Sequence, residues 1–323
     1  MKILHNIGTF SIRSETFVYD LINNLEGSGQ NNMVLTHQRA LEDERPFSKV
    51  KVINESSSFV RKIYHRIFDR SNIRNQKKIL EFIVQYNPDV IHAHFGPNAV
   101  KIYKLLTKFK LNIPLVASFH GMDINVLPFT QSKYHKILME MSSQEKIIFI
   151  SPTYFLKNKM IQLGFNEDVI KIIPSAYNSC FENVIKEKNW NYGEALKLLT
   201  IARFEEVKGH KYLINALFKV LESYPNVTLT LIGYGSLEER IKNQCERLDI
   251  LDKVYFLNKL PHAEISKIIG KYDIYIQPSI IGSDGAEESL SVSTIEAQIS
   301  GLASIVSEIG GLKEVVIDGV TGK

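Results

Sequence analysis

The pattern of residues 198–232 decides the fold of this chain. Leu198-Leu-Thr-Ile-Ala202 is a short apolar run typical of a buried strand, and Gly209–Ser223 follows with apolar residues at helical spacing. Val227-Thr-Leu-Thr-Leu-Ile232 is then a second strand pattern. A strand, a helix and a strand in this order form a βαβ unit, whose strands lie parallel in one sheet.

The same alternation of strand and helix extends along the rest of the chain, with a pause over the polar residues 174–190. The sequence therefore predicts an α/β protein with two doubly wound, Rossmann-like domains, residues 1–175 and 176–323, and a ligand site in the cleft between them. Further strands are predicted at Ile3–Ile7, Met33–Thr36, Val90–Ala93, Leu115–Phe119, Lys146–Ile150, Val254–Leu257 and Asp273–Gln277. Further helices are predicted at Glu15–Leu25, Pro97–Phe109, Tyr154–Leu163, Leu237–Leu248, Ala263–Lys271 and from Val292 onward.

Composition places the chain among ordinary globular proteins, with 44% hydrophobic and 23% charged residues out of 323. It has no apolar run of membrane-spanning length and no signal-peptide core, and its two cysteines favour a reducing, cytoplasmic setting. Residues 1–175 carry 23 Lys/Arg and 15 Asp/Glu, a balance of +8, against 16 and 20, a balance of −4, in the remainder. The basic half suits a phosphate-bearing ligand or an anionic membrane face, and we expect no nucleic-acid partner.

Two basic residues mark a candidate phosphate site. Arg203 ends the strand 198–202, and Lys208 stands at the start of the next helix. Two cations beside a helix N-terminus can bind a diphosphate, although a solvated loop with ion pairs to Glu205 and Glu206 is the alternative interpretation. Nearby, Gly233-Tyr-Gly235 lacks the third glycine of a dinucleotide fingerprint, which favours a tight turn.

Two carboxylates stand eight positions apart in Gly285-Ala-Glu-Glu-Ser-Leu-Ser-Val-Ser-Thr-Ile-Glu-Ala-Gln-Ile-Ser-Gly301. We expect Glu288 in a loop and Glu296 one turn inside the helix that begins at Val292. Carboxylates placed in this way can flank one polar ligand.

Histidines stand at the ends of several predicted strands of the first domain: His37, His92, His94 and His120. His120, before a glycine and near Asp123, is the strongest candidate for acid–base chemistry. We expect no zinc site, because no histidine pair has i, i+4 helical spacing and no cysteine is near. No Asp-x-Asp sequence is present to hold a magnesium or manganese diphosphate either.

Two further segments of the first domain are candidates for function. Gly8–Phe17 joins the first strand to its helix, with Ser14 as the predicted N-cap and Arg13 and Glu15 facing the cleft. Residues 59–86 form a basic amphipathic run that suits either an anionic membrane surface or an ordinary solvated helix. Its cations recur every four residues at Lys62, Arg66, Arg70, Arg74 and Lys78.

Taken together, these motifs resemble glycosyltransferase family 4, whose fold is GT-B. Ser14-Glu-Thr-Phe17, Ile91-His-Ala-His-Phe-Gly96 and Ser118-Phe-His-Gly-Met-Asp123 are similar to the bacterial subgroup that builds capsule, exopolysaccharide or lipopolysaccharide. Arg203 with Lys208, and Glu288 with Glu296, match the family's more general motifs. The resemblance implies a retaining transferase that moves a sugar from a nucleotide-sugar to a glycan or lipid-linked acceptor, with no metal or other cofactor.

The resemblance also implies roles for single residues. Arg203 and Lys208 would hold the donor diphosphate, Glu296 the ribose hydroxyls, and Glu288 the transferred sugar. His120 would lie at the reacting centre. The remaining residues are the donor-side Gly8, Gly233, Val292 and Ser293 and the acceptor-side Arg13, Glu15, His94 and Asp123.

The chain departs from the family pattern in three places. Ser289 and Ser291 stand where the family usually has Gly and Pro, and Ser175-Ala-Tyr-Asn178 replaces an interdomain Asn-Gly-Val-Asp. Family members also continue beyond Thr-Gly-Lys323, so we expect the second domain to be truncated at its C-terminus. The alternatives are therefore a non-catalytic nucleotide-binding remnant and a nucleotide-sugar epimerase. A dehydrogenase is disfavoured, because the first βα turn has only Gly8.

Overall fold

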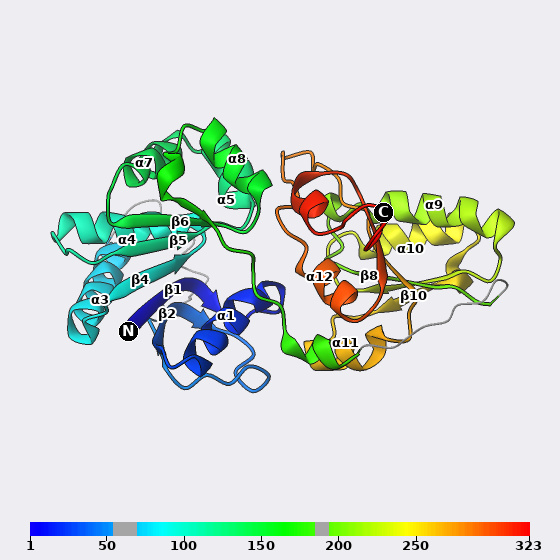
Figure 1. The fold of residues 1–323 in the computed structure, drawn as a ribbon, viewed down its shortest axis with the longest axis horizontal. Helices are drawn as coiled ribbons and strands as arrows, with labels where there is room; N and C mark the ends of the chain where they lie inside the picture. Colours follow the sequence, from blue (N-terminus) through cyan, green and yellow to red (C-terminus); the bar gives the residue numbers. More distant parts are fainter. Residues whose placement is uncertain (54–69, 185–193) are drawn as a thin grey trace. The chain divides into compact units, whose positions relative to one another are not determined.

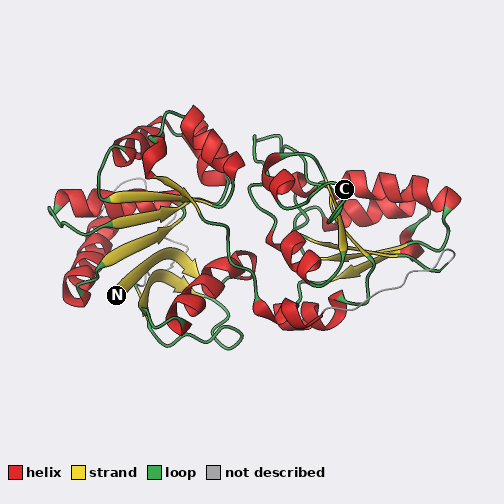
Figure 2. Cartoon of the chain, in the orientation of Figure 1, coloured by secondary structure: helices red, strands yellow, loops and turns green. Residues whose placement is uncertain are grey.

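The computed structural model describes residues 1–53, 70–184 and 194–323 (Figures 1 and 2). The chain forms two compact units. The first unit comprises residues 1–152 and 157–174, and the second comprises residues 153–156 and 175–323. The predicted boundary after residue 175 lies one residue from this division.

The first unit is built on a sheet of seven strands, all paired in parallel. In spatial order they are β3 (Val50–Val52), β2 (Asn31–Arg39), β1 (Lys2–Phe10), β4 (Val90–His94), β5 (Leu115–Ser118), β6 (Ile147–Ser151) and β7 (Ile170–Ile172). Its helices are α1 (Thr16–Gly27), α3 (Arg70–Tyr86), α4 (Gly96–Lys108), α5 (Met122–Asn125), α6 (Leu127–Thr130), α7 (Ser132–Ser142) and α8 (Tyr154–Gln162).

The second unit has a parallel sheet of five strands. In spatial order they are β10 (Val254–Leu257), β9 (Thr228–Ile232), β8 (Lys197–Ile201), β11 (Ile274–Gln277) and β12 (Ala303–Val306). Its helices are α9 (His210–Ser223), α10 (Glu238–Arg247), α11 (His262–Ile269) and α12 (Val292–Ile299).

Successive residues of a strand point to opposite faces of a sheet, and in the second sheet the residues on both faces are apolar. Leu198 packs with α9 and α10 in one core, whereas its neighbour Leu199 packs with α11 and α12 in the other. A continuous apolar run such as 198–202 is therefore the signature of a strand covered by helices on both sides.

The strand order of each sheet reverses at one point. The reversal lies between β1 and β4 in the first unit and between β8 and β11 in the second. At such a switch point the loops after the two central strands leave in opposite directions and form a crevice, where doubly wound proteins bind ligands. The topology therefore directs attention to the loops after β8 and β11.

The doubly wound architecture is confirmed, and three local predictions need correction. Ser14 lies in a short 3-10 turn, Arg13–Glu15, and α1 begins after it at Thr16 without a side-chain cap. Gly8 lies inside β1, which extends to Phe10, and not in the loop after the first strand. The strands β3, β7 and β12 and the helices α5, α6 and α7 were not predicted at all.

The basic run 59–86 is described only in part. Its second half forms α3 from Arg70, while Lys62 and Arg66 lie outside the described residues. Within the described ranges, no helix has the length and apolar character needed to cross a membrane.

Candidate functional site

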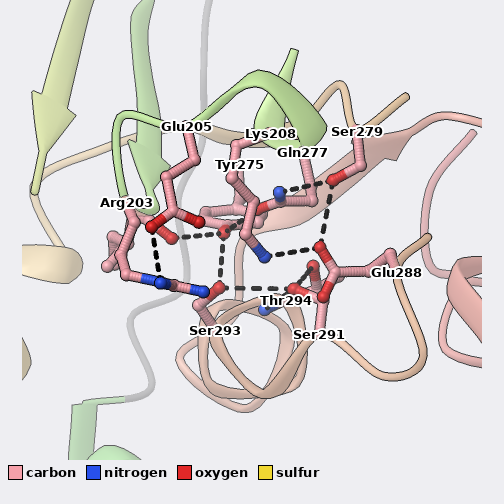
Figure 3. Close-up of polar contacts among 11 residues, drawn as sticks. Arg203, Glu205, Lys208, Tyr275, Gln277, Ser279, Glu288, Ser291, Ser293 and Thr294 are labelled. Atoms are coloured by element: carbon pink, nitrogen blue, oxygen red, sulfur yellow. Dashed lines mark hydrogen bonds and ion pairs between the residues drawn. The ribbon is translucent and has the colours of Figure 1, made fainter. Parts of the chain in front are cut away.

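Two loops of the second unit meet at the switch point between β8 and β11. The first carries Arg203 and Lys208, and the second carries Glu288 (Figure 3). Gly209 has φ of 68°, and a β-carbon there would lie 1.8 Å from the carbonyl oxygen of Pro278. The two backbones can therefore pack at this distance only because residue 209 is glycine.

This close packing brings Lys208 beside Glu288. The Lys208 Nζ lies 2.5 Å from the Glu288 Oε2, and the two side chains are only 18% and 10% exposed. Arg203 pairs with Glu205 at the same distance, but in the open, with 48% and 38% exposure. Arg203 therefore forms the exposed ion pair with Glu205 that the alternative interpretation, a solvated loop, predicts.

A chain of buried hydrogen bonds continues from Glu288 along β11 (Figure 3). The Ser279 hydroxyl donates to Glu288 at 3.1 Å and accepts from the Gln277 amide at 2.8 Å. The Tyr275 hydroxyl donates to the other end of the Gln277 amide at 2.9 Å and lies 2.7 Å from the Ser293 hydroxyl. This chain links the Lys208–Glu288 pair to the first turn of α12.

The N-terminus of α12 lies in this cluster. The Ser291 hydroxyl caps the helix by accepting from the backbone N–H of Thr294 at 3.3 Å and from its hydroxyl at 2.8 Å. Val292 and Ser293 are the first two helical residues, so their N–H groups point out of the helix end. The serine that replaces the family's proline is therefore the helix cap.

Glu296 lies one turn inside α12, as predicted. Its side chain is 4% exposed, and one carboxylate oxygen lies 3.7 Å from the Nδ1 of His262, the first residue of α11. The contact of His262 with Glu296 was not predicted, because it depends on how α11 packs against α12.

Two glycines after β12 donate hydrogen bonds to the loop that carries Glu287 and Glu288, here called the glutamate loop. Gly311 donates its N–H to the carbonyl of Glu288 at 3.0 Å, and a β-carbon on it would lie 1.7 Å from the Ser289 carbonyl. Gly310 donates to the Glu287 carboxylate at 3.1 Å. Ser289 is not among the described non-glycine residues with positive φ, so serine there carries no strain of that kind.

Gly233 and Gly235 have a packing role. A β-carbon on Gly233 would lie 2.0 Å from the Ala202 oxygen, and one on Gly235 would lie 2.5 Å from the Phe204 oxygen. They allow the turn after β9 to lie against the Arg203 loop. Contact of Gly233 with a donor stays a prediction.

Two candidate residues of the first unit, His120 and Asp123, lie just after β5. Asp123 is buried, and its carboxylate accepts the backbone N–H groups of Gly96, His120 and Gly121 at 2.9–3.1 Å. Burial raises the pKa of this carboxyl group, while the three N–H donors act in the opposite direction. Asp123 thus supports the loop that carries His120, and a contact with an acceptor stays a prediction.

The ring of His120 lies between two aromatic residues in tilted arrangements, with its centroid 4.6 Å from those of Phe17 and Phe95. Burial lowers the pKa of His120 to about 3, so the ring is neutral at physiological pH. Its Nε2 has no hydrogen-bond partner among the described residues. A neutral imidazole with an unused nitrogen can donate or accept one hydrogen bond at a reacting centre.

Some of the residues predicted to contact an acceptor are buried. Arg13 pairs with Glu44 beside the β1–α1 connection, and Glu15 is half-buried at the start of α1. His94 is fully buried, and its Nε2 lies 3.1 Å from the Nδ1 of His5. The side chain of His94 therefore points into the interior of the first unit, and its contact with an acceptor stays a prediction.

One cluster of described residues has the composition of a metal site. Ring nitrogens of His5, His92 and His94 lie within 4.8 Å of one another, and all three side chains are buried.

Comparisons with known proteins agree with the fold. A family model described as Glycosyltransferase Family 4 matches residues 14–179, which is more than half of the chain. The chain belongs to glycosyltransferase family 4. A second model, described as Glycosyl transferases group 1, matches residues 181–323. The two doubly wound units are the domains of the GT-B fold.

Relatives of this family 4 glycosyltransferase include enzymes of exopolysaccharide synthesis. The amylovoran biosynthesis glycosyltransferase AmsK of Erwinia amylovora is 25% identical over 364 residues, which cover 100% of this chain and 86% of AmsK. The putative colanic acid biosynthesis glycosyltransferase WcaL of Escherichia coli is 23% identical, over 98% of this chain and 84% of WcaL. The crystal structure of HepE from Anabaena has the same fold, with a TM-score of 0.76 at 18% identity over 100% of this chain and 85% of HepE.

Proposed function

We propose that this chain is a retaining glycosyltransferase that moves a sugar from a nucleotide-sugar donor to a glycan or lipid-linked acceptor in bacterial surface polysaccharide synthesis. The observation that carries the proposal is the Lys208–Glu288 pair, which lies between Arg203 and the N-terminus of α12 at the switch point of the second sheet. The roles of AmsK and WcaL support the pathway, and the UDP and UDP-glucose complexes of HepE support the donor class.

The donor diphosphate binds between the cations and the helix end. Arg203 supplies a planar fork of N–H donors, Lys208 a point charge, and Val292 and Ser293 their backbone N–H groups. These groups neutralise the charge that develops on the departing diphosphate, so the diphosphate itself needs no metal ion. Glu296 accepts the hydroxyl groups of the donor ribose.

The transferred sugar lies beside Glu288. The ion pair with Lys208 and the Ser279 hydroxyl hold the Glu288 carboxylate in place, so that it accepts from sugar hydroxyl groups in a fixed orientation. The leaving phosphate takes the proton of the acceptor hydroxyl on the same face of the sugar, which retains the anomeric configuration. His120 contacts the sugar or the phosphate through its unused nitrogen.

The acceptor is a glycan or a lipid-linked molecule at a membrane. The net charge of +8 over residues 1–175 favours binding to an anionic surface, and basic residues are densest in the run 59–86. The protein acts at the cytoplasmic face, where nucleotide-sugars are made.

Turnover of nucleotide-sugars tests this function. A panel of UDP-, GDP- and ADP-sugars is incubated with a bacterial extract of lipid-linked glycans, and release of the nucleoside diphosphate is measured with and without the extract. We expect release that depends on the extract, and a product with the donor's anomeric configuration by NMR.

Two outcomes would favour other functions. Interconversion of the sugar without any acceptor would identify an epimerase. Nucleotide binding without turnover of any donor would identify a non-catalytic remnant. Glu288→Gln serves as the control variant, because it keeps the volume of the side chain and removes the charge that faces Lys208.

A further inference from the structure

Three histidines gather on one face of the first sheet, at its switch point. His5 on β1 is paired in register with His92 on β4, and His94 follows two residues further along β4. Side chains at i and i+2 of a strand point to the same face, so the three imidazoles form one cluster. The i, i+4 helical spacing used to exclude a zinc site does not detect ligands that lie on neighbouring strands.

The protonation of His5 follows from its neighbours. The Asn32 amide nitrogen donates to the Glu26 carboxylate at 3.0 Å and to the Gln30 carbonyl at 3.1 Å. The Asn32 Oδ1 must therefore be the atom that accepts from the Nε2 of His5, at 3.0 Å. This leaves the Nδ1 of His5 with its lone pair, directed at His94.

The other two rings also have nitrogens to offer. The Nε2 of His92 lies 2.7 Å from the Ser118 hydroxyl, which can accept its proton in a hydrogen bond and leave Nδ1 as a lone pair. The Nδ1 of His94 is buried and has no hydrogen-bond partner among the described residues. Metal-binding histidines are oriented by partners such as Asn32 and Ser118, which bond the ring nitrogen that does not face the metal.

The spacing is close to that of a metal site. Zinc–nitrogen bonds of 2.0–2.1 Å place two ligand nitrogens about 3.3 Å apart in a tetrahedral site. The 3.1 Å between the His5 Nδ1 and the His94 Nε2 meets this once the Nε2 proton has moved to Nδ1. The ligand nitrogens of all three residues lie within 4.8 Å of one another, so binding requires a closure of up to about 1.5 Å and a rotation of the imidazoles about their side-chain bonds.

We propose that His5, His92 and His94 bind a transition-metal ion that prefers imidazole ligands, with Zn²⁺ as the reference ion. His94 binds through Nδ1, or through Nε2 after its proton moves to Nδ1. The ion ties β1 to β4 at the centre of the first sheet. The site is separate from the diphosphate cluster of the second unit and does not depend on the proposed transferase activity.

Metal titration of the full chain tests the proposal. The protein is prepared without a polyhistidine tag and treated with a chelator, and Zn²⁺ is titrated by calorimetry. We expect one ion per chain with submicromolar affinity, and an affinity at least tenfold weaker in His92→Gln. His135→Gln is the matched control, because His135 bonds to the Leu163 carbonyl away from the cluster and its loss should leave the affinity unchanged.

A second measurement keeps the test independent of how well the variants fold. Co²⁺ bound to the wild-type chain is examined by visible and X-ray absorption, and we expect three nitrogen ligands with imidazole scattering. Absence of stoichiometric binding to the wild type, equal affinity in His92→Gln, or a shell of oxygen ligands alone would each overturn the proposal.

Discussion

At the scale of single residues, each cation of the candidate diphosphate site pairs with a carboxylate. Lys208 pairs with the largely buried Glu288, and Arg203 pairs with the exposed Glu205. Glu205 is two positions from Arg203 and belongs to the same loop. In the proposed donor complex, Glu205 would compete with the diphosphate for the guanidinium group of Arg203.

Removing the competing charge should strengthen nucleotide binding. We expect Glu205→Gln to bind UDP about two- to fivefold more tightly than wild type, the range typical of an exposed ion pair. Calorimetric titration measures the change, with Glu222→Gln on α9 as a control that removes an equal charge from an exposed position. The gain should vanish when Arg203→Ala is combined with Glu205→Gln; a gain that survives would mean that Glu205 acts elsewhere.

The buried His210 makes the second unit sensitive to acid. Burial, followed by the charge of Lys208, lowers its pKa from 6.5 to about 4. The unfolded chain takes up this proton below about pH 6.5 and the folded chain only near pH 4, so stability falls as the pH drops through that window.

A leucine at this position should remove that sensitivity. Between pH 7.5 and 5.5, His210→Leu should lose about 1 kcal/mol less stability than wild type, from 1.36 kcal/mol per unit of pKa difference. Urea unfolding at the two pH values measures the loss. An equal loss in both proteins would contradict the assigned shift.

Which site residues the sequence could predict depends on how local their partners are. Arg203, Lys208 and Glu296 stand at strand or helix ends, and their positions follow from the chain itself. The partners Tyr275, Gln277 and His262 depend on side chains far along the sequence, so no local pattern identifies them. The burial of His94 was not predicted, because the end of a strand shows where a residue lies but not which face it points to.

At the scale of elements, the loop with Glu288 is shaped by a turn more than twenty residues further on. Gly311 packs with its α-carbon against the Ser289 carbonyl, and Gly310 has φ of 52°. The role of these glycines was not predictable from the sequence, because it depends on contact with backbone that is distant in the chain.

Adding one methyl group at Gly311 should displace the glutamate loop. Gly311→Ala places a β-carbon 1.7 Å from the Ser289 oxygen, so we expect a loss of about 2 kcal/mol or more in stability and weaker UDP binding. Gly27→Ala in α1 is the control, since a β-carbon there meets nothing within 4 Å. Thermal unfolding compares the two variants, and similar midpoints would contradict the close packing of this turn.

The elements themselves were predictable where their patterns were long. Strands such as β8 and β9 and helices such as α9 were recognised within a residue or two, because apolar runs and helical periodicity define them. The strands β3 and β7 span three residues each, too few for a pattern. Ser14 has the chemistry of a cap, but an intervening 3-10 turn moves the start of α1 beyond it.

At the scale of the whole molecule, charge is divided between the two parts of the chain. The excess of +8 in residues 1–175 and the deficit of −4 in the remainder give the protein one basic part and one acidic part. The basic part should bind anionic surfaces through long-range attraction.

Vesicle sedimentation tests this attraction. The chain should sediment with phosphatidylglycerol vesicles at low salt and be released at about 0.5 M salt, because screening shortens the Debye length. Zwitterionic phosphatidylcholine vesicles are the control. Equal binding to both vesicles, or binding that salt leaves unchanged, would argue against an electrostatic membrane contact.

In the proposed function, Arg203, Lys208 and the N-terminus of α12 form the diphosphate site of a sugar-nucleotide donor. Calorimetric titration of UDP, GDP and ADP into wild type, Arg203→Ala and Arg240→Ala tests this site, with Arg240→Ala as a control for loss of an exposed charge on α10. We expect at least one nucleotide to bind wild type and Arg240→Ala equally, and Arg203→Ala about tenfold more weakly, the effect of losing hydrogen bonds to a charged group. Binding of no nucleotide, or equal binding to Arg203→Ala, would contradict the proposed site.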